Sequence, residues 1–143
     1  MISAKSRQHK ENRDTHVRRK HSNKKFYNSK AWRETREAYM RFYRNRLYTE
    51  MPKLGRFKDQ TLTAQQVTYL LSLDYLPCET CLRLYIANAY DSVQPGEELD
   101  HIIPVNPNNA LEISGMSYGD PFEFNNLQLL CRRHHSKKSQ RER

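Results

Sequence analysis

The sequence between Leu99 and Lys138 decides what this chain can be, and it carries a motif at each end. One motif reads Leu-Asp-His-Ile-Ile-Pro over residues 99–104, and the other reads Asn-Asn-Leu-Gln-Leu-Leu-Cys-Arg-Arg-His-His over residues 125–135. Together they place an acid, three histidines and a cysteine in one short unit. His101 can take a proton from water, while Asp100 and a second imidazole can hold a divalent cation. With a Cys/His pair suited to zinc, this set predicts metal-assisted hydrolysis of phosphodiesters.

The three cysteines predict a zinc site. Cys78 and Cys81 are separated by two residues, a gap that lets both thiolates reach one tetrahedral ion, and Cys131 leaves the count odd. A redox pair is the rival interpretation, but no strand-rich segment precedes Cys78. On a helix, His134 shares a face with Cys131 and can complete the site, while a rotation of about 100° directs His135 elsewhere.

Composition and charge indicate a soluble, basic protein with a small core. The 143 residues have a formal charge of +9, a pI near 9.6 and a mean hydropathy of −1.00. Nucleic acid is the commonest acidic partner for such a chain, and a merely well-solvated surface is the alternative. The basic N-terminus has no apolar segment behind it, and no run approaches the roughly 18 apolar residues of a membrane span. We therefore expect a cytoplasmic location.

The remaining sequence predicts mainly helices. Residues 1–25 carry nine Lys/Arg and are expected to be disordered, as a phosphate-binding arm or a solubilising tail. Residues 26–77 form a helical segment. Asn28 or Ser29 caps its first helix, residues 49–60 are a linker, and Thr63 and Gln66 form the capping box of a second helix. The expected buried side chains of the first helix are Trp32, Thr35, Tyr39, Phe42 and Tyr43, and those of the second are Val67, Leu70 and Leu71.

The C-terminal half predicts shorter elements. Residues 82–89 can form an irregular strand or a short helix, and the sequence does not decide between them. Residues 98–105 read as a strand and 106–121 as a loop. A last helix begins near residues 127–131 and continues through Lys138, and residues 139–143 are a basic tail.

The combined pattern resembles the HNH endonuclease family, in particular the small HNH nucleases of bacteriophages and bacteria. The matching pieces are Cys-x-x-Cys, the Asp-His motif, Asp-Pro-Phe at 120–122, and Asn-Leu-Gln-x-Leu-Cys-x-x-His-His-x-x-Lys at 126–138. They cover residues 78–138, and residues 26–32 are also similar to several small phage members. The resemblance implies an α+β fold, with a small ββα-metal (His-Me finger) HNH core at 78–138, N-terminal helices and a zinc staple.

The resemblance also implies roles for individual residues. Asp100 and His135 would hold a catalytic Mg²⁺ or similar ion, His101 would be the general base, and Asn126 would brace the loop. The structural zinc ligands would be Cys78, Cys81, Cys131 and His134. The commoner family pattern has a cysteine where His134 stands.

The expected function is metal-dependent cleavage of double-stranded DNA with low sequence specificity. Four basic residues are expected either to grip phosphates or to form a solvated face: Arg132, Arg133, Lys137 and Lys138. A zinc-stapled nucleic-acid-binding module without cleavage is the alternative. A third possibility, suggested only by the phage resemblance, is a component of a DNA-packaging machine in a phage-infected bacterial cell.

Overall fold

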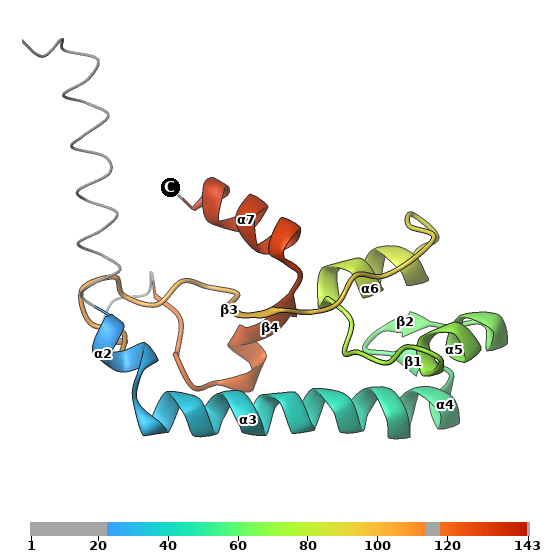
Figure 1. Cartoon of the computed structure of the whole chain (residues 1–143), viewed down its shortest axis with the longest axis horizontal. Coiled ribbons are helices and arrows are strands. Elements are labelled where there is room, and N and C mark those ends of the chain that lie inside the picture. The colour runs from blue at the N-terminus through green and yellow to red at the C-terminus, as the bar shows by residue number, and fades with distance from the viewer. Residues whose placement is uncertain (1–22, 114–117, 143) are drawn as a thin grey trace, which may run out of the picture. The chain divides into compact units, whose positions relative to one another are not determined.

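The computed structural model describes residues 23–113 and 118–142 (Figure 1). The chain divides into two compact units. Among the described residues, the loop unit comprises 23–35, 101–113 and 118–126, and the cluster unit comprises 36–100 and 127–142. Residues 1–22 of the predicted disordered arm (residues 1–25) lie outside the described residues. Beyond it, Lys24 begins the short helix α2 (Lys24–Tyr27).

One continuous helical segment follows α2. It consists of α3 (Lys30–Asn45), the π-helix η1 (Arg46–Glu50) and α4 (Met51–Leu54), and it ends at Gly55 with φ +63° (Figure 1). The predicted cap is confirmed, since the Trp32 N–H donates to Ser29 Oγ at 3.2 Å. The predicted linker at 49–60 is wrong, because residues 49–54 are helical and residues 56–57 and 60 belong to a β-hairpin. The wider π-helical turn of η1 accommodates Pro52, which has no N–H to donate to the helix. Met51, just before the proline, is buried, with 1% of its surface exposed.

The next elements are a hairpin and a capped helix. Strands β1 (Arg56–Phe57) and β2 (Gln60–Thr61) are antiparallel, and α5 spans Ala64–Leu71. The capping box is confirmed, because the Gln66 N–H donates to Thr63 Oγ1 at 3.1 Å and the Thr63 N–H donates to Gln66 Oε1 at 2.9 Å. The predicted buried face is partly wrong, since Leu71 is 41% exposed. Gln66 is buried instead, and its Nε2 donates to a backbone carbonyl of α6 at 3.4 Å, that of Ile86.

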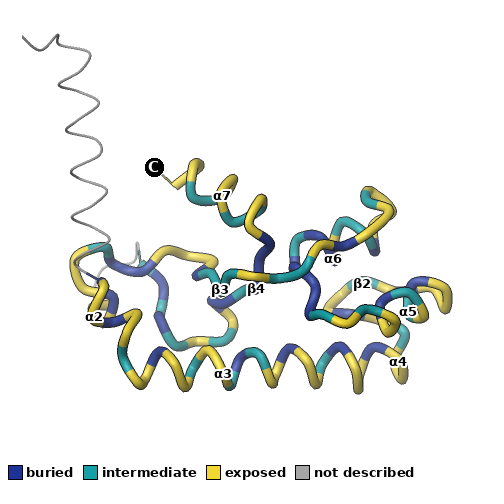
Figure 2. The backbone as a smooth tube through the Cα atoms, in the orientation of Figure 1, coloured by how far each residue is buried: buried dark blue, intermediate teal, exposed yellow. Residues whose placement is uncertain are grey.

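The remaining elements are α6 (Glu79–Ile86), β3 (Glu98–His101), the 3₁₀ turn η2 (Phe124–Asn126), β4 (Leu127–Leu130) and α7 (Arg132–Arg141). The open alternative at residues 82–89 is thus settled as a helix. Strand β3 is shorter than the predicted 98–105 strand. It pairs with β4, and Figure 2 shows the buried stretch from β4 into the start of α7. The last helix begins only after Cys131, because residues 127–130 are in the sheet.

The α+β class is confirmed by this mixture of helices and small sheets. The order β3, β4, α7 is strand, strand, helix, and the assignment to a nuclease fold stays a prediction. No helix among the described residues has the length and apolar character required to cross a membrane.

Candidate functional site

Two helices of the cluster unit begin at the predicted zinc ligands. Cys78 is the N-cap of α6, and Cys131 is the N-cap of α7. The Cys81 N–H donates to Cys78 Sγ at 3.4 Å, and the His134 N–H donates to Cys131 Sγ at 3.5 Å. The positive end of each helix dipole therefore lies at a sulfur, where it favours the thiolate.

The four side chains converge as a tetrahedral site requires. His134 Nδ1 lies 3.5, 3.4 and 3.3 Å from the Sγ atoms of Cys78, Cys81 and Cys131, and all four atoms lie within 4.8 Å of one another. Bond lengths of about 2.3 Å to sulfur and 2.05 Å to nitrogen put S and N about 3.6 Å apart around a tetrahedral zinc ion. The cluster could therefore hold a structural metal such as zinc.

Burial sets the protonation of this cluster. It raises the pKa of the Cys78 thiol and raises that of Cys81 to about 12. Burial also lowers the pKa of His134, and the nearby cations Arg133 and Lys137 lower it further. At neutral pH, the His134 imidazole is therefore neutral, while both thiols would stay protonated until a cation displaced their protons.

Tyr90 orients His134, a contact that no sequence pattern indicates. Tyr90 Oη lies 3.3 Å from His134 Nε2, and the two rings are nearly parallel, at 15°. With Nδ1 directed at the sulfurs, Nε2 carries the hydrogen and donates it to Tyr90. A partner on the second nitrogen of a ligating histidine fixes its tautomer. No spacing rule could have identified Tyr90, because it lies in a loop far from His134 in sequence.

Glu79, next to Cys78, is a second residue that the sequence did not reveal. It is 2% exposed, and its Oε2 accepts hydrogen bonds from Tyr39 Oη and from the Leu129 N–H, both at 2.6 Å. Lys58 Nζ lies 3.3 Å from Oε1. Burial, followed by the charge of Glu79, raises the pKa of Tyr39. The Glu79 carboxylate, at the start of α6, therefore contacts residues of α3, the β1–β2 hairpin and β4.

Removing one of these hydrogen bonds should destabilise the fold. Tyr39→Phe is expected to cost about 1.5–3 kcal/mol, the range for hydrogen bonds to charged groups. Chemical denaturation followed by circular dichroism measures it, with the half-exposed Tyr48→Phe as the matched control. Equal stability of the two variants would show that the hydrogen bond from Tyr39 to Glu79 does not stabilise the fold.

The predicted catalytic metal ligands are neighbours in the cluster unit. His135 Nε2 lies 3.8 Å from Oδ1 of Asp100, and its Nδ1 lies 3.5 Å from Oε2 of Glu98. The other oxygen of Asp100, Oδ2, accepts a hydrogen bond from Gln128 Nε2 at 3.0 Å and lies 3.1 Å from Lys138 Nζ. Glu98, Gln128 and Lys138 thus complete a polar group around Asp100 and His135.

The predicted base lies in the loop unit among aromatic rings. His101 is 6% exposed, and its ring centroid is 5.0 Å from that of the buried Trp32. His101 Nε2 lies 3.1 Å from the Pro121 carbonyl oxygen. A carbonyl can only accept, so Nε2 is the donor, and Nδ1 carries the lone pair of the neutral ring.

Asn126 fixes the backbone that follows His101. Its Oδ1 accepts from the Ile103 N–H at 2.8 Å, and its Nδ2 donates to the carbonyls of Ile103 and Asp120 at 3.0 and 3.1 Å. Gly119 lies against this amide: an added Cβ would be 2.3 Å from Asn126 Nδ2 and 2.4 Å from the Ile103 oxygen. The geometry suits the predicted bracing role of Asn126.

The four predicted phosphate-binding residues differ in their surroundings. Arg132 lies 3.8 Å from Glu97, and Lys138 pairs with Asp100 and Glu142. Arg133 and Lys137 are exposed, and no ion pair within the described part of the chain includes either of them.

Comparison with known proteins places the chain in no family. No family model, no curated protein and no solved structure matches the chain.

Proposed function

We propose that this protein is a zinc-stapled, metal-dependent endonuclease that hydrolyses phosphodiester bonds of double-stranded DNA. The observation that carries the proposal is the proximity of Asp100 and His135, whose Oδ1 and Nε2 are 3.8 Å apart. Asp100 and His135 can together hold a metal ion, and His101, which follows Asp100 in the sequence, can act as a base. These are the groups that metal-dependent phosphodiester hydrolysis requires.

The donor atoms of Asp100 and His135 fit one small divalent cation. Two adjacent ligands at about 2.1 Å from an octahedral ion are about 3.0 Å apart, so the observed separation of 3.8 Å requires the two side chains to close by about 0.8 Å when the ion binds. Oxygen and nitrogen donors suit Mg²⁺ or Mn²⁺. Such an ion would supply positive charge for the leaving oxygen of the phosphodiester.

His101 is the proposed general base. The hydrogen bond from Nε2 to Pro121 selects the tautomer in which Nδ1 is the basic nitrogen, and Trp32 restricts the rotation of the ring. Asn126 holds the segment after His101 through Ile103, which limits movement of the base.

Conversion of supercoiled plasmid by the purified protein tests the proposal. Nicked or linear DNA should form with Mg²⁺ or Mn²⁺ and not with EDTA. The structural zinc must be retained in the EDTA arm, which a zinc assay on the recovered protein verifies.

A nucleic-acid-binding module without cleavage is the second candidate. The burial of His101 at 6% exposure favours it, because a water molecule must reach a general base. A gel shift by the protein, without plasmid conversion under any cation, would establish this candidate and exclude the nuclease.

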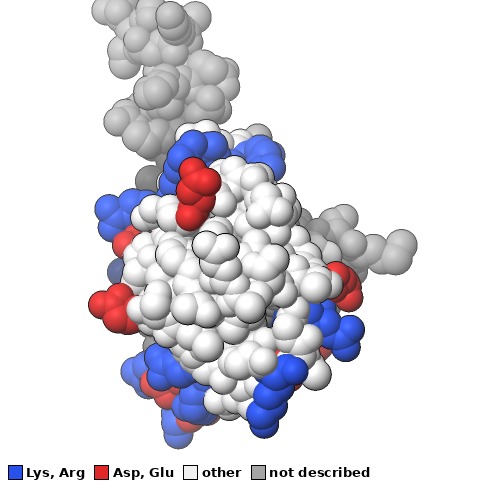
Figure 3. Space-filling view, turned by 90° about the vertical axis from the view of Figure 1, so that its right-hand side faces the viewer, with Lys and Arg blue, Asp and Glu red and all other residues white. Residues whose placement is uncertain are grey.

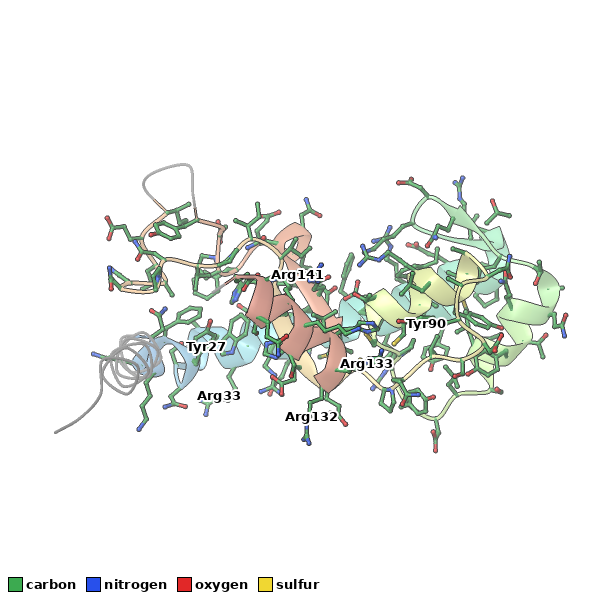
Figure 4. The ribbon with its side chains drawn as sticks, turned by 90° about the horizontal axis from the view of Figure 1, so that it is seen from above. Tyr27, Arg33, Tyr90, Arg132, Arg133 and Arg141 are labelled. Carbon is green, nitrogen blue, oxygen red and sulfur yellow. The ribbon has the colours of Figure 1, made fainter. Side chains whose placement is uncertain are left out.

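We place the main phosphate contacts on the exposed residues of α7. Arg133, Lys137 and Arg141 recur every four residues and therefore lie along one side of the helix. Figure 4 shows Arg132, Arg133 and Arg141 projecting from α7, with Tyr90 beside the helix. Helix α5 has no charged residue, and Figure 3 shows a largely uncharged face bordered by charges at that end of the cluster unit.

Arg133→Ala should therefore weaken DNA binding more than Arg132→Ala. Loss of one phosphate contact is expected to reduce the slope of log affinity against log salt by about 0.9. Arg132 is the matched neighbour, already paired with Glu97. Fluorescence anisotropy with a short duplex at several salt concentrations measures both slopes, and identical slopes would remove Arg133 from the interface.

A further inference from the structure

Lys138 forms an ion pair with Asp100, the carboxylate that the proposed function assigns to the divalent cation. Lys138 Nζ lies 3.1 Å from Oδ2 of Asp100, and the two side chains are only 15% and 10% exposed. Gln128 donates to the same oxygen at 3.0 Å. Since little water reaches this pair, it is screened less than an ion pair on the open surface.

The charges around Lys138 leave an excess that suits one divalent ion. Glu142 also pairs with Lys138, and Glu98 faces His135 Nδ1 at 3.5 Å. The three carboxylates of Asp100, Glu98 and Glu142 outnumber the one ammonium of Lys138 by two charges. A cation at Asp100 and His135 is therefore attracted by the acids and repelled by the ammonium.

We propose that Lys138 is the resident counter-cation of Asp100 and competes with the divalent cation for that carboxylate. The inference rests on the proposed function, because it takes Asp100 as a ligand of the catalytic ion. His135 and Lys138 are three residues apart on α7, so the imidazole and the ammonium reach Asp100 from the same side of one helix. Binding of the cation must weaken the Asp100–Lys138 pair, which leaves the ammonium beside the cation, where the phosphate of a substrate brings its negative charge. Lys138 is thus a positioning residue that sets how tightly the ion binds before DNA arrives.

Titration of Mn²⁺ into the zinc-loaded full chain, followed by electron paramagnetic resonance of the unbound ion, tests this competition. Lys138→Met should bind Mn²⁺ on the order of tenfold more tightly than the parent, because a positive charge a few ångströms from the ion is removed. Lys137→Met is the matched control: it removes the same charge from an exposed neighbour and should change the affinity less than about twofold. Lys138→Gln repeats the measurement in case the methionine variant does not fold, and thermal melting verifies the fold of each variant.

The outcomes separate this inference from the proposed function. Equal or weaker Mn²⁺ binding by Lys138→Met and Lys138→Gln overturns the inference, and Lys138 then only holds Asp100 in place. If Asp100→Asn weakens Mn²⁺ binding while the lysine variants do not strengthen it, the inference alone fails. If neither the parent nor the lysine variants bind Mn²⁺, or Asp100→Asn binds as the parent does, the proposed cation site fails as well.

Discussion

Cys131→Ser is expected to abolish the cooperative unfolding transition of the cluster unit. Cys131 caps α7 and shares the ligand cluster with Cys78, the cap of α6, so its loss releases the starts of two helices. Structural zinc in zinc-finger peptides contributes about 10–16 kcal/mol at pH 7, which is comparable to the roughly 5–15 kcal/mol by which a whole domain is usually stable. Removal of the metal by a chelator should have the same effect.

Zinc content and thermal melting measured on matched histidine variants make this test specific. His134→Ala should lose the bound zinc and the transition, because His134 Nδ1 lies within 3.5 Å of all three sulfurs. His135→Ala, one residue further on, should retain one zinc ion and melt cooperatively. Zinc-free parent protein with an unchanged melting temperature would contradict the prediction.

His101→Ala is expected to lower the rate of DNA cleavage by about 10²–10⁴-fold, the usual contribution of a general base. The loss should fall on the rate at saturating DNA, since no contact of His101 with the substrate backbone is required for binding. Plasmid conversion under single-turnover conditions measures it. A gel shift with the same DNA should give the affinity of the parent.

Two controls separate loss of the base from loss of the fold. Asn125→Ala changes an exposed neighbour of the bracing Asn126 and should cleave at close to the parental rate. Added imidazole should partly restore cleavage by His101→Ala, because the substitution leaves room between Trp32 and Pro121 for the missing ring. A variant that cleaves at nearly the parental rate without imidazole would exclude His101 as the base.

Features defined by local spacing were predictable from the sequence. The Thr63–Gln66 capping box depends on residues three apart, and it formed as predicted. The same holds for the two histidines of α7: the helical rotation between neighbours predicts that only His134 joins Cys131, and the sulfur distances agree.

Features that depend on distant packing were not predictable. The helix continues through Met51-Pro52 because Leu47 and Met51 are buried, and no local pattern indicates that burial. Tyr90 and Glu79 act on the cluster through contacts made only in the folded chain. Likewise, Lys138 reads as a surface cation in the sequence, whereas the fold places it on Asp100.

The close approach of Gly119 to Asn126 limits which sequences can keep this loop. The position excludes other residues for lack of space, since the nearest atoms to an added Cβ include the backbone oxygen of Ile103, which cannot rotate away. Even the methyl group of an alanine at position 119 would push residue 119 away from Ile103 and Asn126. Exposed residues earlier in the loop, such as Asn108, Leu111 and Ile113, lie outside that contact, so natural variation should accumulate at them and stop at residue 119.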